Sequence, residues 1–403
     1  MEKSTKSPLI SAYEAENIIL SELRDFGIEQ ISIEKALGRI LASPLIADRD
    51  FPPFDRVTMD GIAINFISYQ SGNREYRIQS TQSAGEEKHK LMLDNECIEV
   101  MTGADLPKNT DTIIRYEDLE ITNGIAKILT QIKPQQNVHF KGEDRKKGTI
   151  IVKENQKIRS TEIAVAASIG AVELTVKKLP KIAIITSGDE LVAIDKTPEL
   201  HQIRSSNVYA IASILNEYGI ESTKIHIQDD FDQTVDTIEK IISDFDVLIL
   251  SGGVSMGKKD FIPKALENLG IEKLFHKIAQ TPGKPIWFGK KAKKLVFALP
   301  GNPVSTYMCM VRYFRPWLNQ SLDLKNIETG FAHISEDFQF PSPVTYFLQV
   351  KLSNHNGVLI AQPIKGHGSG DFANLVDADA FLELPAFERN EFIKGEVFKI
   401  WLF

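Results

Sequence analysis

Between residues 180 and 300 the chain alternates short apolar runs with stretches of helical periodicity, and this pattern restricts the fold more than any other feature. Apolar runs of this kind are typical of strands buried on both faces, as in a parallel sheet covered by crossover helices. We therefore predict a doubly wound α/β domain. Its strands are expected at 182–186, 222–227, 247–250 and 295–299, and its helices include 207–218 and 234–245.

The rest of the chain carries other patterns. Apolar positions at helical spacing over residues 13–41 predict a helical lead-in. From residue 51 to about 144, short alternating segments lie between Gly, Asn and Pro turns, which predicts an inserted β domain. An Ala-rich helix over 161–171 and an extended segment over 172–176 are grouped with the lead-in as one module. Strands of a terminal β module are expected at 346–352, 357–363, 380–384 and 396–403.

Four domains follow from these patterns, because 403 residues exceed one ordinary core and suggest about two to four domains. A module of helical and extended segments combines residues 1–48 with 145–178, and the inserted β domain at 49–144 interrupts it. The α/β domain spans 179–322, and the terminal β domain spans 323–403.

Composition narrows the class of protein. With 42% hydrophobic and 25% charged residues, the chain has enough apolar surface to fold. A net charge of -7 argues against a nucleic-acid binder, which needs a basic surface. Two cysteines, Cys97 and Cys309, cannot form a disulfide framework, so they are interpreted as buried thiols of a protein in a reducing compartment. No signal-peptide core and no apolar window of membrane-spanning length is found, and we expect a cytoplasmic protein without membrane contact.

Polar or glycine-rich segments follow three of the predicted strands. In open α/β sheets the ligand crevice lies beyond the carboxyl ends of the strands. Glycine-rich loops and helix N-termini there can direct backbone N–H groups at an oxyanion. The candidate ligand-binding residues are Ser187, Gly188 and Asp189 after the first strand, Ser251, Gly252, Gly253, Ser255 and Gly257 after the third, and Pro300, Gly301, Asn302, Pro303 and Ser305 after the fourth. A single loop of this kind is usually only a tight turn, whereas three that converge indicate a phosphate site.

Charged residues lie beside these loops. Glu190, Asp230 and Asp260, together with Asp229, could hold a hard cation such as Mg²⁺ against phosphate oxygens. Alternatively, they are solvated helix caps, an interpretation that is equally favoured for Asp229 and Asp232. Lys284, in a Pro-Gly-Lys-Pro turn, could offer a positive charge to phosphate.

The inserted β domain has polar clusters of its own. Asp60 ends a segment rich in proline and aromatic residues, Thr102 follows an expected strand, and Asp144 closes the charged run 141–144. Each cluster taken alone would be interpreted as a surface turn.

At this point seven stretches match one family in order. They are PPFDRVTMDGIAI, MTGADLPKNTDTIIRYED, FKGEDRKKGTII, KIAIITSGDELV, ILSGGVSMGKKDF, TPGKPIWFG and FALPGNPVS. They resemble the molybdopterin molybdenumtransferases, the MoeA type that is also found as the E domain of gephyrin. The resemblance implies a stalk, an inserted β domain, a molybdopterin-binding α/β domain and a C-terminal β barrel, assembled as a homodimer.

The activity that the resemblance implies is the insertion of molybdate into adenylylated molybdopterin with release of AMP. It further implies Mg²⁺ or a similar cation, a molybdopterin adenylyltransferase that delivers the substrate, and an active cleft between subunits. By the matching motifs, the catalytic residues are Asp60, Thr102, Asp144, Glu190 and Lys277, and the metal ligands are Glu190, Asp230 and Asp260.

Two departures from the family pattern bear on function. Thr58 and Ile62 flank Met-Asp-Gly where the family has other residues, a change we judge to be tolerated. Thr281 replaces a lysine that the family has in the cleft. A catalytically diverged paralogue that acts as a pterin-binding or scaffold protein is therefore an alternative. A nucleotidyltransferase that adenylylates the pterin is a third hypothesis, but such enzymes resemble the α/β domain alone.

Overall fold

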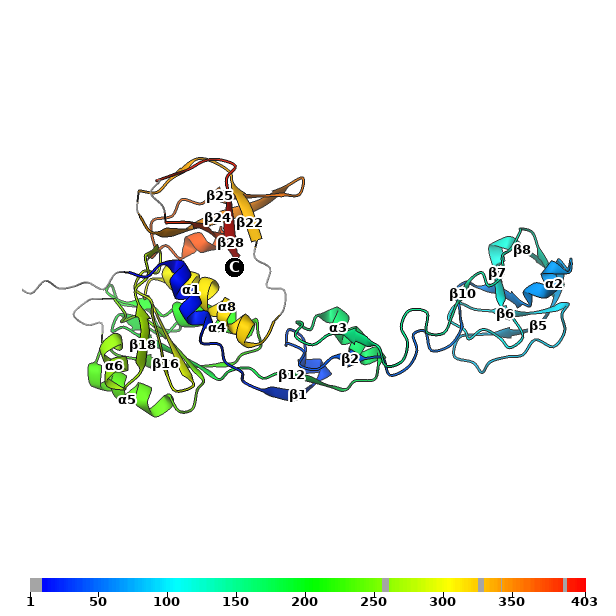
Figure 1. The fold of residues 1–403 in the computed structure, drawn as a ribbon, viewed down its shortest axis with the longest axis horizontal. Coiled ribbons are helices and arrows are strands. Elements are labelled where there is room, and N and C mark those ends of the chain that lie inside the picture. The colour runs from blue at the N-terminus through cyan, green and yellow to red at the C-terminus, as the bar shows by residue number, and fades with distance from the viewer. Residues whose placement is uncertain (1–8, 256–260, 325–329, 342, 387–389) are drawn as a thin grey trace, which may run out of the picture. The chain divides into compact units, whose positions relative to one another are not determined.

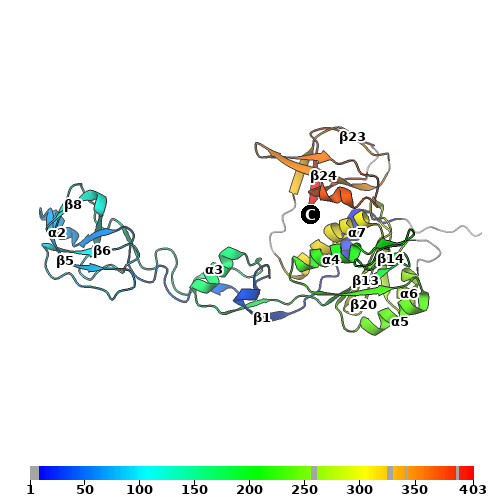
Figure 2. The same ribbon diagram turned by 180° about the vertical axis from the view of Figure 1, so that it is seen from behind.

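The computed structural model describes residues 9–255, 261–324, 330–341, 343–386 and 390–403. Figures 1 and 2 show its ribbon from opposite sides. The chain folds into two compact units, which are treated separately below. The larger unit comprises Met1–Ala42, Asn155–Arg159 and Glu173–Phe403, and the smaller comprises Ser43–Glu154 and Ser160–Val172.

A six-stranded sheet in the order β16-β13-β17-β21-β20-β18 is the centre of the larger unit. The strands β13 (Ile182–Ser187), β16 (Ser222–Ile227), β17 (Val247–Ser251) and β21 (Lys294–Leu299) are parallel and confirm the four predicted strands. The remaining strands, β20 (Trp287–Lys291) and β18 (Glu272–His276), were not predicted, and β20 runs antiparallel to both of its neighbours.

Helices cover both faces of this sheet, so the predicted doubly wound fold is confirmed (Figure 1). Ile182 and Ile184 face one core cluster, and Ala183 and Ile185 face the other, because successive side chains of a strand alternate between its faces. The first cluster includes residues of α1 (Ala12–Leu20), α4 (Asn207–Asn216), α7 (Pro303–Cys309) and α8 (Arg315–Ser321), and the second includes residues of α5 (Phe231–Ile241) and α6 (Ile262–Asn268). A π-helical segment, Met310–Phe314, joins α7 to α8.

The C-terminal strands close into a barrel, as the resemblance implied. Its strands pair in the order β24-β25-β22-β28-β26, and β26 pairs again with β24. They are β22 (Gly330–Ile334), β24 (Thr345–His355), β25 (Val358–Pro363), β26 (Ala380–Leu384) and β28 (Val397–Leu402). The short strand β19 (Gln280–Thr281) of the α/β region pairs with β24. A small two-stranded sheet, β23 (Phe338–Gln339) with β27 (Glu391–Phe392), completes this region, which also contains the 3-10 turn Ala373–Val376.

The prediction of a helix throughout residues 13–41 is wrong beyond α1. A capping box between Ser11 and Glu14 starts this helix, which ends at Leu20. The chain then forms β1 (Ile28–Ser32) and the 3-10 turn Ile33–Lys35. Gly27 has a φ of +83°, which a helix does not allow, and β1 pairs with the distant strand β12 (Glu173–Lys177). Long-range pairing therefore overrides the local helical spacing.

The smaller unit contains a second six-stranded sheet, in the order β7-β4-β6-β5-β9-β8, which confirms the predicted inserted β domain. Its strands are β4 (Gly61–Ile64), β5 (Glu75–Gln82), β6 (Glu96–Val100), β7 (Thr112–Arg115), β8 (Leu119–Thr122) and β9 (Ile125–Ile128). The unit also has β2 (Leu45–Ile46) paired with β11 (Ile150–Val152), β3 (Arg56–Val57) paired with β10 (Val138–His139), and the helices α2 (Phe66–Gln70) and α3 (Ser160–Ser168), with a 3-10 turn at Tyr116–Asp118. The four domain boundaries stay a prediction.

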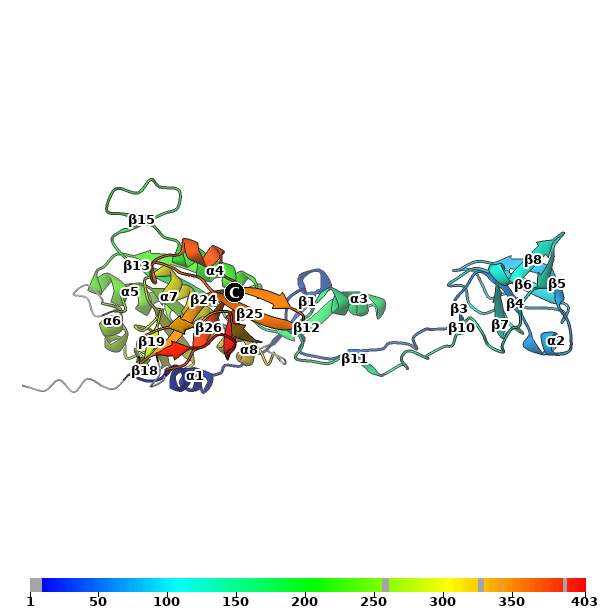
Figure 3. The same cartoon turned by 90° about the horizontal axis from the view of Figure 1, so that it is seen from above.

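The connection between β13 and α4 contains a pair of short strands that forms a separate sheet. Figure 3 shows this excursion, in which β14 (Leu191–Val192) pairs with β15 (Ile203–Arg204). Among the described residues, no helix has the length and apolar character needed to cross a membrane.

Candidate functional site

The loops after β13, β17 and β21 line one cavity of about 670 Å³ in the larger unit. This volume is within the usual range for a small-molecule site, which is roughly 300–1,000 Å³. The predicted site residues that line it are Ser187, Gly188, Glu190, Ser251, Gly252, Gly253, Ser255, Lys284, Pro300, Gly301, Asn302, Pro303 and Ser305. The three loops are therefore brought together at the carboxyl ends of the parallel strands.

Glycine allows two of these loops to touch. Gly252 has a φ of +101°, and a Cβ atom there would lie 2.5 Å from the carbonyl oxygen of Ser187. A Cβ on Gly301 would lie 3.5 Å from the Cα of Gly252. Because the first of these distances is too short for any side chain, the loop after β17 can pack on the loop after β13 only with glycine at position 252.

Asn207 connects the loop after β17 to the loop after β21. Its side-chain Nδ2 donates hydrogen bonds to the carbonyl oxygen of Gly301 at 2.7 Å and to Oγ of Ser251 at 2.9 Å. Since Asn207 begins α4, the helix and both loops are held as one frame. Sequence reasoning assigned this residue only to the start of a helix and missed its role at the cavity.

Two of the acidic residues predicted for the site, Asp189 and Asp230, do not belong to the described lining of the cavity. Asp230 is the N-cap of α5, accepting a hydrogen bond from the backbone N–H of Gln233 at 2.8 Å, and it is not among the described lining residues. Its neighbour Asp229 lines the cavity and accepts a hydrogen bond from Oγ of Ser187 at 2.7 Å. Asp189 accepts from the backbone N–H of Asp229 at 3.1 Å and does not belong to the described lining. The cap position must directly precede the helix, so Asp230 rather than Asp229 takes it.

Positive charge at the cavity comes from two described lining residues, Arg204 and Lys284. Arg204 was not predicted. Lys277 is not part of the described lining; it has a φ of +75°, and its N–H donates to the carbonyl of Ile286 at 2.9 Å. Its neighbour His276 lies with Nε2 at 3.1 Å from the carbonyl oxygen of Val254, and burial lowers its pKa.

The barrel region contributes residues that no sequence argument identified. Ser369 and Gly370 line the cavity. Oγ of Ser369 accepts a hydrogen bond from Nδ2 of Asn302 at 2.7 Å. The backbone carbonyl of Ser369 accepts a second one from the N–H of Val304 at 3.1 Å. The glycine spacing in Gly366-His367-Gly368-Ser369-Gly370 was an available signal for a loop that closely approaches another backbone.

The donor set at the cavity fits a hard divalent cation in part. Glu190 and Asp229 offer carboxylate oxygens, which Mg²⁺ prefers, and Mg²⁺ usually takes only one or two protein carboxylates besides phosphate oxygens and water. Within the described part of the chain, no group of three His, Cys, Asp or Glu residues is arranged to hold a metal ion. Two predicted site residues, Gly257 and Asp260, lie outside the described residues.

In the smaller unit, Asp60 and Thr102 are in direct contact. Hydrogen bonds from the backbone and side chain of Thr102 lower the pKa of the exposed Asp60 carboxyl. Asp144 contacts His139 instead, with its Oδ1 atom 3.0 Å from Nε2 of the histidine. The Nδ1 atom of the same histidine lies 3.0 Å from a guanidinium nitrogen of Arg56. The structure thus pairs Asp60 with Thr102 and places Asp144 with a histidine and an arginine.

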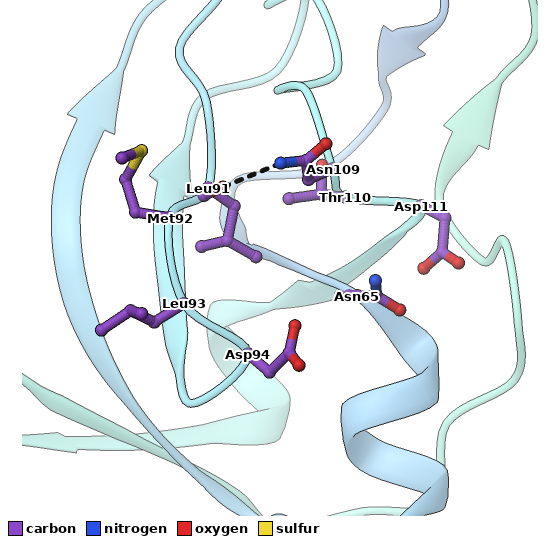
Figure 4. Close-up of a pocket in the computed structure, with 8 residues that line it drawn as sticks. All are labelled: Asn65, Leu91, Met92, Leu93, Asp94, Asn109, Thr110 and Asp111. Carbon is purple, nitrogen blue, oxygen red and sulfur yellow. Dashed lines mark hydrogen bonds between the residues drawn. The ribbon is translucent and has the colours of Figure 1, made fainter.

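The smaller unit also has a cavity of about 380 Å³, shown in Figure 4. Nδ2 of Asn109 donates to the carbonyl of Leu91 at 3.0 Å at its edge. Its described lining, Asn65, Leu91, Met92, Leu93, Asp94, Asn109, Thr110 and Asp111, includes none of the predicted site residues. We therefore take the cavity of the larger unit as the candidate site.

Three family models match the chain in order. The MoeA N-terminal region (domain I and II) matches residues 10–170, a probable molybdopterin binding domain matches 183–320, and the MoeA C-terminal region (domain IV) matches 332–403.

Relatives match over nearly the whole chain. A molybdopterin molybdenumtransferase from Synechocystis sp. is 38% identical over 399 residues, which are 98% of this chain and 100% of the relative. An enzyme of the same name from Staphylococcus epidermidis is 29% identical over 388 residues, which are 94% of this chain and 93% of the relative. Two crystal structures of the molybdopterin biosynthesis MoeA protein from Pyrococcus horikoshii align over 98% of this chain and 99% and 100% of theirs, with TM-scores of 0.81 and 0.83 at 31% and 25% identity.

Proposed function

Since this chain belongs to the MoeA family of molybdopterin molybdenumtransferases, we propose that it inserts molybdate into adenylylated molybdopterin and releases AMP. The transferase activity in molybdenum cofactor biosynthesis follows from the family. The observation that carries the finer proposal is the single cavity at which three strand-end loops meet.

Phosphate recognition is the first task of this cavity. The N–H of Gly252 donates to the carbonyl of Leu299 at 3.2 Å, so we assign the oxyanions of a diphosphate to the backbone N–H groups that follow it in this loop and to the positive charge of Lys284. Molybdate is also an oxyanion and needs the same kind of partner. We assign these loops to the two anions of the reaction.

Charge neutralisation is the second task. Cleavage of the phosphoanhydride by water gives AMP and the molybdopterin phosphate, and negative charge develops on the departing phosphate oxygens. Mg²⁺, when bound, would neutralise that charge. Glu190, with Asp230 and Asp260 by family resemblance, is the proposed ligand set, and Asp229 adds a carboxylate at the cavity wall.

The sulfur ligands of molybdenum come from the substrate. The two dithiolene thiols bind molybdenum through sulfur, and their two protons leave with one molybdate oxygen as water, so the protein need not supply a thiolate. Burial raises the pKa of Cys97 to about 12, and the pKa of the fully buried Cys309 is raised further. Neither thiol is available as a nucleophile or ligand at neutral pH.

The remaining catalytic residues, Asp60, Thr102, Asp144 and Lys277, keep the roles that the resemblance implies. We propose that the enzyme is a cytoplasmic homodimer whose active cleft uses the inserted domain of the partner subunit. A molybdopterin adenylyltransferase would supply the substrate. The MoeA-type N- and C-terminal regions argue against adenylylation as the activity of this chain itself.

The decisive experiment combines purified protein with adenylylated molybdopterin, molybdate and Mg²⁺, and measures AMP by chromatography. We expect AMP release that stops on chelation with EDTA and is restored by Mg²⁺. Glu190→Gln should lower kcat, whereas Glu199→Gln, at a side chain that is 73% exposed, should not. Binding of the pterin without AMP release would contradict the proposal and favour the scaffold alternative.

A further inference from the structure

One wall of the cavity is a turn that contacts, on the side away from the cavity, buried residues outside the lining. Thr281, Pro282, Gly283, Lys284 and Pro285 face the cavity. Gln280, which directly precedes this turn, is only 1% exposed. The hydroxyl of the buried Tyr313 donates a hydrogen bond to its Oε1 atom. The hydrogen bond between Tyr313 and Gln280 thus links the protein core to the segment that contains Lys284.

Tyr313 stands on the π-helical segment Met310–Phe314. Pro316 follows it and has no N–H to donate to the carbonyl of Arg312, so the widened turn lies where the regular helix bonding is interrupted. Arg312, at 2% exposure, forms ion pairs with Glu16 at 2.8 Å and Glu383 at 3.3 Å. These contacts fix the segment on which Tyr313 is carried.

Backbone bonds hold the base of the turn, where Gln280 and Thr281 pair with β24. The N–H of Ile278 donates to the carbonyl of Lys284 at 3.0 Å, and the N–H of Thr345 donates to the carbonyl of Ala279 at 3.1 Å. A Cβ on Gly283 would lie 2.8 Å from Sγ of Cys309, which shows how closely the turn packs on α7. Gln280 and Thr281 are adjacent in β19, so the position of Gln280 bears directly on the Thr281–Lys284 segment.

We propose that Tyr313 is a positioning residue for anion binding, which acts through Gln280 to hold the Lys284 turn at the cavity wall. The proposal rests on the function assigned above and adds a residue that does not touch substrate. Burial raises the pKa of Tyr313 well above its usual range, so its hydroxyl remains a hydrogen-bond donor at physiological pH.

The test compares Tyr313→Phe, which removes only the hydroxyl, with Tyr307→Phe as a matched control. Tyr307 lies on α7, packs on Phe403, and has no hydrogen bond from its hydroxyl to a described residue. For Tyr313→Phe we expect the Kd of molybdate, measured by calorimetry, to rise about three- to tenfold, the effect of losing one neutral hydrogen bond. The KM for molybdate in AMP release should rise in parallel while kcat stays unchanged.

Double variants identify the route of the effect. Gln280→Met should reproduce the change, and adding it to Tyr313→Phe should not increase it. In a Lys284→Ala background, Tyr313→Phe should have no further effect. Additive losses would overturn the proposed route through Gln280 and Lys284.

A measurement without substrate separates this proposal from the proposed function. Hydrogen exchange at the amide of Ile278, which is bonded to the Lys284 carbonyl, should accelerate in Tyr313→Phe and not in Tyr307→Phe. Absence of AMP release by the wild type would contradict the proposed function, yet this exchange comparison would still decide the positioning role. Unchanged exchange and unchanged molybdate affinity in a Tyr313→Phe protein with a native-like melting temperature would overturn it.

Discussion

Thr102 donates two hydrogen bonds to the same carboxylate oxygen of Asp60, one from its backbone N–H at 2.6 Å and one from its hydroxyl at 2.7 Å. Two donors on one oxygen stabilise the ionised form, which is why the pKa of Asp60 is lowered. Both residues were predicted as site residues from separate motifs, and the fold makes them one unit. Asp60 is therefore kept charged and oriented by its neighbour.

The first prediction concerns this pair. Thr102→Val removes the hydroxyl donor, so the pKa of Asp60 should rise toward its usual range, as measured by NMR titration of labelled aspartate carboxyls. The pKa of Asp60 is lower in the folded state than in the unfolded state, so its contact with Thr102 stabilises the fold at neutral pH. That stabilisation is lost as the pH falls through the folded-state pKa. Thr58→Val is the control, because the Thr58 hydroxyl bonds to the carbonyl of Asn137. An unchanged Asp60 titration in Thr102→Val would show that the hydroxyl is unimportant.

The second prediction tests the contact between the loops after β13 and β17. In Gly252→Ala the new methyl group meets the backbone of Ser187, and neither strand end can move without disturbing the sheet. Gly270→Ala is the matched control, because Gly270 also has a positive φ, +67°, but open space around it. We expect Gly252→Ala to lose about 1–3 kcal/mol more free energy of unfolding than the control, the usual cost of overpacking. Equal losses in urea denaturation would refute the steric argument.

The third prediction addresses the frame around Asn207. Asn207→Ala leaves the Gly301 carbonyl and the Ser251 hydroxyl without this donor. The expected loss is about 1–3 kcal/mol of unfolding free energy, with weaker binding of the pterin substrate. Asn216→Ala, at the exposed end of the same helix, should change neither quantity. A stable Asn207→Ala protein with wild-type affinity would mean that the loops hold their positions without it.

The fourth prediction concerns charge at the cavity wall. Thr281 lines the cavity on the same turn as Lys284, at a position where the family resemblance implies a lysine. Thr281→Lys should tighten molybdate binding, whereas Thr281→Met, of similar bulk but neutral, should not. The gain should shrink as ionic strength rises, because salt screens the added charge. A gain in the methionine variant, or one that is insensitive to salt, would point to packing instead of charge.

Much of the fold could be predicted because its signals are local. Three of the four parallel strands, β13, β17 and β21, are apolar runs because both of their faces are buried, whereas the edge strand β16 is mostly exposed or half-buried and carries polar residues. The β domains appear in the sequence as alternating segments between turns. The antiparallel strands β18 and β20 were missed because lysines, a glutamate and a histidine interrupt their apolar residues. The helix predicted over 13–41 failed after Leu20, because pairing with β12 decides the conformation of residues 28–32.

For the candidate site, the sequence by itself determined which residue types lie at the ends of the parallel strands, since glycines and carboxylates there follow directly from chain order. Only the tertiary structure decided that Asp229 instead of Asp230 lines the cavity, and that Asn207 and Ser369 belong to it. The physical reason is the distance along the chain: Asn207 bonds to a carbonyl 94 positions away, and Ser369 bonds to a side chain 67 positions away. Such contacts leave no periodic trace in the sequence, because they depend on how whole strands and helices pack.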